Sequence, residues 1–424
     1  MRPTPWLLFW ALDSALATSS SAQQPVAQAC PGYQTPTVVC INNHAAVLPL
    51  PFFRSSPPGN LAAALPDDSF NSTSVPGDAS FSLVHEASFV VFDTARGSAL
   101  LGPSPVLETV FDNLGSAVHE APAYVPALNS IIVSRLSADT VPQILINLTA
   151  TPPIKSDFVP SPPIYGVNGA RYYNGTVYWA AVGSNFTFDS KQYLQTPGIY
   201  ALDPLTREAK PILNNYFGQA FNSPDDLAID PDTGDIFFTD PFYGFALNFT
   251  TALPVLKAQT YRFRPSTGAV SVVEADIACP NGVAISPDGR TLYITDTEAA
   301  KIDFAIATLP RYEIKAREPK AVYAFDLLWT PAGKVLANKR ALWYPEQLID
   351  DGFHVAADGT LLGAAGYSVD VLSPYGELLV KIQLDFYALN LAFAGPDLDE
   401  LWIFGVGKIA RTKLNLKGIA GGWS

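Results

Sequence analysis

The chain has 424 residues, of which 48% are hydrophobic and only 15% are charged. This composition is too apolar for a disordered chain and predicts a folded protein with a large core. The formal net charge is −13, from 26 Lys and Arg against 39 Asp and Glu, and the basic residues form no cluster. We therefore expect neither nucleic acid nor a membrane as a partner.

Residues 1–22 have the character of a secretory signal peptide. Arg2 precedes a short apolar stretch from Trp6 to Ala17, which Asp13 interrupts, and small residues follow up to Ala22. The stretch is shorter than the ~20 apolar residues that a membrane span needs. We therefore expect a secreted, soluble protein.

Two further features agree with export. Cys30 and Cys40 lie close together in a Pro-rich segment, where a disulfide is predicted in an oxidising compartment, although spacing alone does not exclude a pairing with Cys279. The predicted glycosylation sites are the sequons at Asn71, Asn147, Asn174, Asn185 and Asn248.

Residues 23–80 differ in composition from the rest of the chain. They are rich in Pro, Ser and Ala and carry little β pattern, so we expect an irregular N-terminal extension. Residues 81–424 carry alternating apolar patterns and turn signals, which predict a single all-β domain.

One phrase recurs six times in this domain: a polar residue, a short strand, a Pro/Asp/Gly turn and a strongly β-forming strand. The clearest copies are Asp225-DLAIDPDTGDIFFTDP, Asn281-GVAISPDGRTLYITDT and Asp351-GFHVAADGTLLGAAG, and fainter ones begin at Glu120, Asn168 and Asn390. A second hairpin lies between copies, as at 199–213 and 260–274, so each unit holds four strands.

Four antiparallel strands repeated six times predict a six-bladed β-propeller. A β-sandwich gives no reason for a six-fold phrase. The last copy ends before its blade is complete. We expect the segment 87–95, which is rich in Val and Phe, to supply the missing outer strand and close the ring.

The polar residue of each copy precedes the innermost strand of a blade. All inner strands of a propeller start at the same end of its centre, so these side chains should converge. They are Glu120, Asn168, Asp225 with Asp226, Asn281, Asp351 and Asn390.

Oxygen ligands of mixed charge are those that Ca²⁺ prefers, whereas Zn²⁺ sites rely on His and Cys. Each residue alone could equally cap a turn, but six in register favour a site. His119 and His354 flank this set, and the sequence does not decide whether either takes part.

Three stretches resemble the signatures of a known family: Ser223-PDDLAIDPDTGDIFFTDPFYG, Pro280-NGVAISPDGRTLYITDT and Asp350-DGFHVAADG. They are similar to those of the gluconolactonase and senescence-marker-protein family, and closest to its fungal secreted lactonohydrolases. The resemblance covers residues 110–415. It implies a six-bladed propeller that holds one divalent metal, Ca²⁺ or Zn²⁺, and hydrolyses sugar lactones.

The resemblance also implies roles for individual residues. Glu120, Asn281 and Asp351 fall on the metal ligands, with Glu86 as a second candidate for the first position, and Asp351 falls on the general acid/base. Relatives usually show Pro-Asn-Asp where this chain has Pro-Asp-Asp, so Asp225 replaces a substrate-contacting Asn. That extra charge should tighten cation binding and disfavour an acidic substrate.

The predicted reaction is the metal-dependent opening of a sugar-type or pantoyl-type lactone. A metal would polarise the carbonyl, Asp351 or Asp226 would accept a proton from water, and the substrate would contact Asn168, Asp225 and His354. Two alternatives stay open. One is an arylesterase-like or organophosphate-hydrolase-like propeller, which Tyr165, Phe242 and Tyr243 would suit, and the other is a non-catalytic metal-binding propeller. The particular lactone and the oligomeric state are not predicted.

Overall fold

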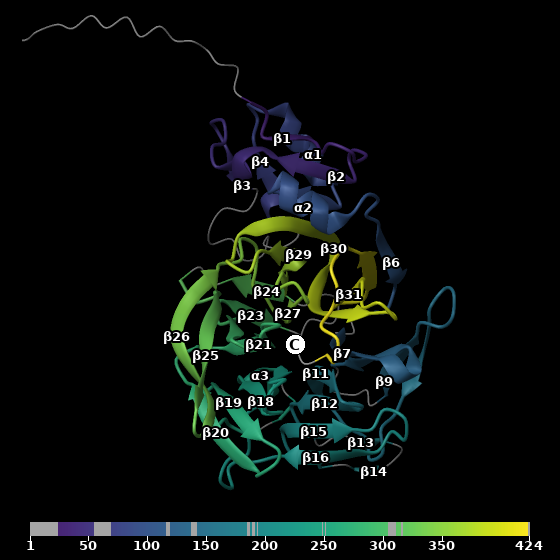
Figure 1. Cartoon of the computed structure of the whole chain (residues 1–424), viewed down its shortest axis with the longest axis vertical. Coiled ribbons are helices and arrows are strands. Elements are labelled where there is room, and N and C mark those ends of the chain that lie inside the picture. The colour runs from purple at the N-terminus through teal and green to yellow at the C-terminus, as the bar shows by residue number, and fades with distance from the viewer. Residues whose placement is uncertain are drawn as a thin grey trace, which may run out of the picture.

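The computed structural model describes residues 24–54, 69–115, 119–136, 142–184, 187–188, 191–192, 194–247, 249–250, 252–303, 311–314 and 317–422. Its strands form a ring of sheets, and a smaller N-terminal lobe lies against one side of the ring (Figure 1). The predicted signal peptide and the sequons at Asn185 and Asn248 lie outside the described residues. No helix in the described ranges is long and apolar enough to cross a membrane.

The first four blades are separate sheets of four antiparallel strands, and the strands of each blade follow one another in chain order from the centre of the ring outward. Blade 1 holds β7 (His119–Val125), β8 (Ser130–Arg135), β9 (Gln143–Asn147) and β10 (Ile154–Phe158), and blade 2 holds β11 (Val167–Tyr173), β12 (Thr176–Ala181), β15 (Gly198–Leu202) and β16 (Ala209–Leu213). Blade 3 holds β17 (Leu227–Ile229), β18 (Ile236–Asp240), β19 (Gln259–Arg264) and β20 (Ala269–Glu274), and blade 4 holds β21 (Pro280–Ile285), β22 (Thr291–Asp296), β25 (Val322–Thr330) and β26 (Gly333–Trp343).

Blades 5 and 6 share one long strand, β30 (Leu378–Ala394). Its first part pairs with β29 (Gly366–Leu372) and completes blade 5 after β27 (Phe353–Val355) and β28 (Leu361–Ala364). Its second part pairs with β31 (Glu400–Gly405) and is the inner strand of blade 6, which continues with β32 (Ile409–Lys413). The pairings therefore group into six four-stranded blades, as the repeats predict.

The ring is closed by a different strand from the one expected. β6 (Leu107–Phe111) pairs with β32 and is the outer strand of blade 6. The segment 87–95 instead contains β5 (Phe89–Val91), which pairs with the first part of β30 outside blade 5. All three residues of β5 are buried, because strands cover both of its edges. Its strong apolar pattern thus reflects burial between the lobe and blade 5.

The N-terminal lobe extends blade 5. β1 (Ala27–Ala29) pairs with β2 (Val38–Ile41), and β2 pairs in parallel with β5. A disulfide joins Cys30 and Cys40 at this sheet. The extension is therefore only partly irregular. The remaining elements of the lobe are β3 (Phe53–Arg54), β4 (Thr73–Ser74), α1 (Ser82–Glu86), α2 (Thr94–Leu101) and the 3-10 turns Asn42–Ala45, Phe70–Ser72 and Ala79–Phe81.

Short elements decorate the ring. Two hairpins, β13 (Thr187–Phe188) with β14 (Lys191–Gln192) and β23 (Ala300–Asp303) with β24 (Arg311–Ile314), follow the second strands of blades 2 and 4. The helix α3 (Tyr243–Ala246) follows the second strand of blade 3, and a 3-10 turn, Pro126–Leu128, links β7 to β8.

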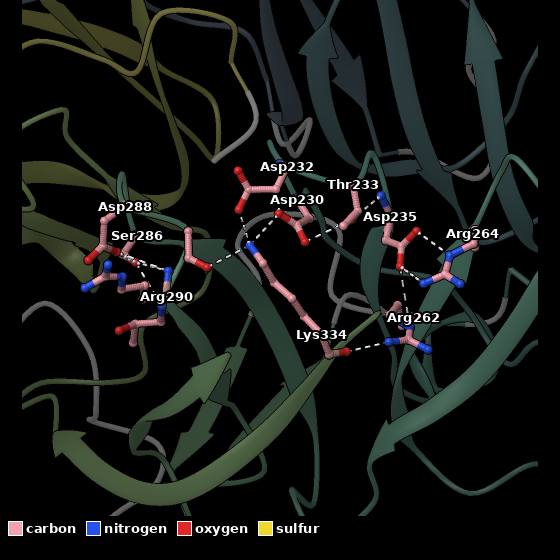
Figure 2. Close-up of polar contacts among 12 residues, drawn as sticks. Asp230, Asp232, Thr233, Asp235, Arg262, Arg264, Ser286, Asp288, Arg290 and Lys334 are labelled. Atoms are coloured by element: carbon pink, nitrogen blue, oxygen red, sulfur yellow. Dashed lines mark hydrogen bonds and ion pairs between the residues drawn. The ribbon is translucent and has the colours of Figure 1, made fainter. Parts of the chain in front are cut away.

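A buried ion cluster joins blades 3 and 4 at their first turns (Figure 2). The turn 230–235 has the acidic spacing of a Ca²⁺ loop, but the ammonium of Lys334 occupies its concave side. Lys334 Nζ lies 2.8 Å from Asp230 Oδ1, 2.7 Å from Asp232 Oδ2 and 2.9 Å from the carbonyl oxygen of Gly289. Lys334 is almost fully buried, so the aspartates of this turn take part in a structural ion pair between the two blades.

Candidate functional site

The polar residues that begin the inner strands meet at one end of the ring, which we call the mouth. Glu120, Asp225 and Asp351 are all buried there. Burial and the charge of Asp351 raise the pKa of Glu120 and of Asp225 well above the usual range, with further contributions from Asp226 to both. These carboxylates therefore face one another, as the six-fold register predicts.

A backbone irregularity aims the side chains at the mouth. The inner strands of blades 2 and 4 shift register across Asn168 and Asn281, and those of blades 1 and 6 shift register directly beside Glu120 and Asn390. A β-bulge bends the strand and redirects a side chain. In these four blades the irregularity thus lies at or beside the residue that belongs to the mouth.

The glycine after the site residue lets neighbouring blades pack closely. A Cβ on Gly282 would lie 2.4 Å from the carbonyl oxygen of Asp351, and one on Gly169 would lie 2.3 Å from that of Asp225. Real Cβ atoms do not approach so near. The glycines of the two Asn-Gly pairs are thus required by the spacing of the inner strands.

A threonine at the end of the second strand fixes the site residue of the next blade. Thr239 Oγ1 donates to the carbonyl oxygen of Asn281 at 2.6 Å. Thr295 Oγ1 occupies the corresponding place in blade 4 and donates to the carbonyl oxygen of Asp351 at 3.4 Å. Both hydroxyls are buried, so these bonds hold the backbone of the two site residues in register.

The aspartate that follows each threonine caps the loop entering its own blade. Asp240 accepts hydrogen bonds from the backbone N–H groups of Asn222 and Ser223 at 3.0 and 2.7 Å. Asp296 accepts from those of Ala278 and Cys279 at 3.2 and 3.1 Å. The Thr-Asp pair of the repeat therefore has two structural tasks, one within its blade and one across to the next.

Asp351 and Asn281 lie side by side at the mouth. Burial raises the pKa of Asp351 to about 7, and a hydrogen bond from the Asn281 side chain partly opposes the rise. Asp225 lies near them, and its Oδ2 is buried without a hydrogen-bond partner in the described part of the chain. A buried carboxylate oxygen without a donor is unfavourable, so this atom calls for a ligand.

Asp226 is placed differently from the role expected for it. Its Oδ2 is 3.1 Å from Arg171 Nη2 and 3.1 Å from the backbone nitrogen of Val283, and its Oδ1 accepts from the backbone of Leu227 at 2.8 Å. Arg171 and Asp226 are both buried. Because both oxygens are occupied, Asp226 acts as the partner of Arg171 at the centre of the ring. Arg171 gave no signal in the sequence, since it stands in the middle of an ordinary strand.

Asn390 connects Glu120 to His354. Asn390 Nδ2 donates to Glu120 Oε2 at 2.9 Å, and Asn390 Oδ1 accepts from the backbone of Leu391 at 2.8 Å and lies 3.2 Å from His354 Nε2. His354 and Arg171 line a cavity of about 70 Å³ at the end of the ring opposite the mouth. His354 therefore reaches the mouth through Asn390, which differs from its predicted contact with the substrate.

Three residues considered for the site remain: Asn168, Glu86 and His119. Asn168 is buried at the mouth and makes no side-chain hydrogen bond to the described residues. Glu86 is exposed in α1 of the N-terminal lobe, away from the ring, so the structure favours Glu120 for the first position. The side chain of His119 lies outside the described part.

The donor set at the mouth suits a hard cation. It offers carboxylate and carboxamide oxygens, and a bound positive charge would oppose the rise that neighbouring carboxylates cause in the pKa of Glu120 and Asp225. Among the described residues, no three His, Cys, Asp or Glu side chains are placed to hold an ion by themselves. An ion here would therefore depend on Asn281 as well as on Glu120 and Asp351.

Comparison with known proteins agrees with this geometry. Residues 179–406 match the SMP-30/gluconolactonase/LRE-like region. Lactonohydrolase oryL of Aspergillus oryzae is 39% identical over 393 residues, which cover 92% of this chain and 88% of that protein. The chain belongs to the SMP-30/gluconolactonase family. Another family member, lactonohydrolase oryH of the same fungus, is 36% identical over 460 residues, with 96% of each chain covered.

Solved structures show the same fold in this family. A putative gluconolactonase superposes with a TM-score of 0.61 at 21% identity and covers 77% of this chain and 98% of its own. A gluconolactonase from Xanthomonas campestris gives 0.59 at 23% identity, covering 76% and 94%. The propeller predicted from the repeats is thereby confirmed. About a quarter of this chain has no counterpart in either structure.

Proposed function

We propose that this protein is a cation-dependent lactonase that opens the ring ester of a small, neutral, hydroxylated lactone at its mouth. Its family and its similarity to two lactonohydrolases over almost their whole length make it a lactonase-type hydrolase. The observation that carries the proposal further is the convergence of Glu120, Asp225 and Asp351 in a buried space, where burial and the charge of Asp351 raise the pKa of the other two.

In this proposal Glu120, Asn281 and Asp351 hold one divalent cation. Ca²⁺ fits best, because the donors are all oxygen atoms and His354 is turned toward Asn390. The cation would supply Lewis acidity that polarises the lactone carbonyl. Asn390 keeps one oxygen of Glu120 engaged at 2.9 Å, so the other oxygen is left for the ion.

The chain's own residues then supply the proton transfer and the positioning. Asp351 is the proton acceptor for the attacking water, because burial raises its pKa to about 7. We place Asp226 in a supporting role, since Arg171 and the backbone occupy both of its oxygens. The unpaired Oδ2 of Asp225 is suited to accept a hydrogen bond from a substrate hydroxyl, and Asn168 can contact a second one.

The surroundings of the mouth favour a polar substrate over an aryl ester. Of the three aromatics that would suit an apolar substrate, Tyr165 is buried, Tyr243 is hydrogen-bonded to Asn281, and Phe242 alone is exposed, at 37%. The cluster of carboxylates also disfavours a substrate that carries negative charge. We therefore favour an aldonolactone or a pantoyl-type lactone.

Export is part of the same proposal. The Cys30–Cys40 disulfide is typical of a protein that folds in an oxidising compartment. The sequon at Asn174 lies exposed in the turn between β11 and β12, where a glycan would be accommodated. Glycosidase treatment of the protein recovered from a fungal culture medium would test both the export and the glycan.

A substrate panel tests the proposed reaction. Purified protein with added Ca²⁺ is assayed by base titration on an aldonolactone, pantoyl lactone and phenyl acetate. We expect turnover of at least one of the two lactones and slower turnover of the phenyl ester. A preference for phenyl acetate would overturn the substrate class while leaving the hydrolase intact.

A further inference from the structure

A row of hydrogen bonds leads from Asn281 into the loops around the mouth. Asn281 Nδ2 donates to the hydroxyl of Tyr243 at 3.2 Å, and that hydroxyl lies 2.6 Å from Thr297 Oγ1. Thr297 Oγ1 lies 3.2 Å from the carbonyl oxygen of Cys279, two residues before Asn281. The row therefore starts at a predicted ligand and ends at a backbone carbonyl.

The carbonyl at its end sets the direction of every bond in the row. A carbonyl oxygen only accepts, so Thr297 donates to Cys279 and accepts from Tyr243. Tyr243 thereby uses its one proton on Thr297, and its oxygen is left to accept from Asn281. The thiol of Cys279 lies beside both hydroxyls, but it is a weak donor and a weak acceptor and does not reverse this order.

This order determines which way the amide of Asn281 faces. The oxygen and nitrogen of an Asn side chain are told apart by their hydrogen-bond partners. Turned over, Asn281 would place its oxygen against the Tyr243 hydroxyl, whose proton is already used. The contact with Tyr243 therefore demands an N–H group of Asn281, and Oδ1 accepts no hydrogen bond from the described residues.

We propose that Tyr243 is a positioning residue that, together with Thr297, fixes the Asn281 amide so that its Oδ1 is the atom presented to the cation. This rests on the proposed cation site. Without Tyr243 the amide could turn and direct an N–H toward the cation, which would repel it. The backbone of Asn281 is held separately by Thr239 at 2.6 Å, so loss of the Tyr243 hydroxyl should change the amide and leave the strand in place.

Ca²⁺ titration calorimetry of the metal-free protein tests the proposal. Tyr243→Phe removes the acceptor and keeps the ring, and Thr297→Val removes the acceptor of the Tyr243 proton. Partners of metal ligands typically contribute about 10- to 100-fold in metal affinity, so we expect Ca²⁺ affinity to fall about 10-fold in both variants. Thr297→Ser keeps the hydroxyl and should bind Ca²⁺ like the wild type.

A matched control separates this role from general loss of a buried tyrosine bond. Tyr200 is buried and donates to the carbonyl oxygen of Thr196 at 2.7 Å, so Tyr200→Phe should leave Ca²⁺ affinity unchanged. If the wild type binds Ca²⁺ and Tyr243→Phe binds it equally well, this inference is wrong and the cation site stands. If the wild type binds no Ca²⁺, the cation site itself is wrong, and this inference fails with it.

Discussion

Arg171 Nη2 lies 3.1 Å from Asp226 Oδ2 at the centre of the ring, and both side chains are at most 4% exposed. An ion pair this deeply buried is costly to break, because removing one partner leaves an uncompensated charge. The pair joins blade 2 to blade 3, and a third contact, from Arg171 to the carbonyl oxygen of Val283 at 3.3 Å, reaches blade 4.

We expect Arg171→Met to lower the free energy of unfolding by about 3 kcal/mol, since Asp226 would stay buried without its partner. Urea unfolding followed by fluorescence measures the change. Arg340→Met is the control, because its pair with Asp326 is exposed and should contribute less than about 1 kcal/mol. Equal changes in the free energy of unfolding for the two substitutions would show that the central pair stabilises the fold no more than an exposed pair does.

The stability of the metal-free protein should fall as the pH rises from about 4 to about 7. A carboxyl group whose pKa is raised on folding binds more protons in the folded state across this range, so raising the pH favours unfolding. Asp351, with a pKa of about 7, is one such group, and Glu120 and Asp225 shift in the same direction. Exposed carboxyls with lowered pKa, such as Asp326, act the opposite way.

Thermal melts of chelated protein at about pH 5 and about pH 8 measure this dependence. We expect the higher Tm at pH 5, and a larger gain from Ca²⁺ at pH 8, where the carboxylates are ionised. Asp351→Asn should flatten the dependence, because it removes one of the titrating groups. A metal-free protein that is more stable at pH 8, with or without Asp351, would contradict the proposed crowding of carboxylates.

Glu120→Gln should weaken Ca²⁺ binding by about 10-fold or more, since a charged oxygen ligand becomes a neutral one. Asn390 can still donate to the new amide oxygen, so the fold should be retained. Glu86→Gln is the matched control, because Glu86 is exposed in the N-terminal lobe. Weaker Ca²⁺ binding in Glu86→Gln, with Glu120→Gln unchanged, would reverse the assignment of the first ligand.

Lys334→Met should destabilise the protein and leave its specific activity unchanged. The ammonium neutralises Asp230 and Asp232 in a turn of the first hairpin of blade 3, so its loss should lower the free energy of unfolding by about 2–4 kcal/mol. Activity per folded molecule, measured well below the Tm, separates the two effects. A loss of activity in fully folded Lys334→Met would show that this cluster influences the mouth.

The six-fold phrase was sufficient to predict the propeller and the convergence at the mouth. Each copy encodes a local hairpin, and the polar residue keeps the same place in each inner strand, so repetition alone brings Glu120, Asn281 and Asp351 together. The closing strand was mispredicted for a physical reason. Residues 89–91 are more apolar than the true closing strand, because they are covered at both edges, whereas β6 is half-exposed at the rim.

Residues whose role depends on a partner in another blade could not be predicted. Arg171 and His354 stand on ordinary strands, and only the closed ring brings them to Asp226 and Asn390. Tyr243 is the first residue of α3, which follows the second strand of blade 3 and is not part of the repeated motif, so the repeat gave no sign of its approach to Asn281. The Thr-Asp pairs were visible in the sequence, but their link to the next blade was not.

The central claim is that the mouth opens lactones with the help of Asp351 and a bound cation. The most direct test measures kcat on the best lactone of the panel for wild type and Asp351→Asn, each with a chelator and then with saturating Ca²⁺. We expect the chelated wild type to be inactive and restored by Ca²⁺, and Asp351→Asn to lose about 10²- to 10⁴-fold in kcat at saturating Ca²⁺. A wild type that is unaffected by chelation, or an Asp351→Asn variant with wild-type kcat, would contradict the account.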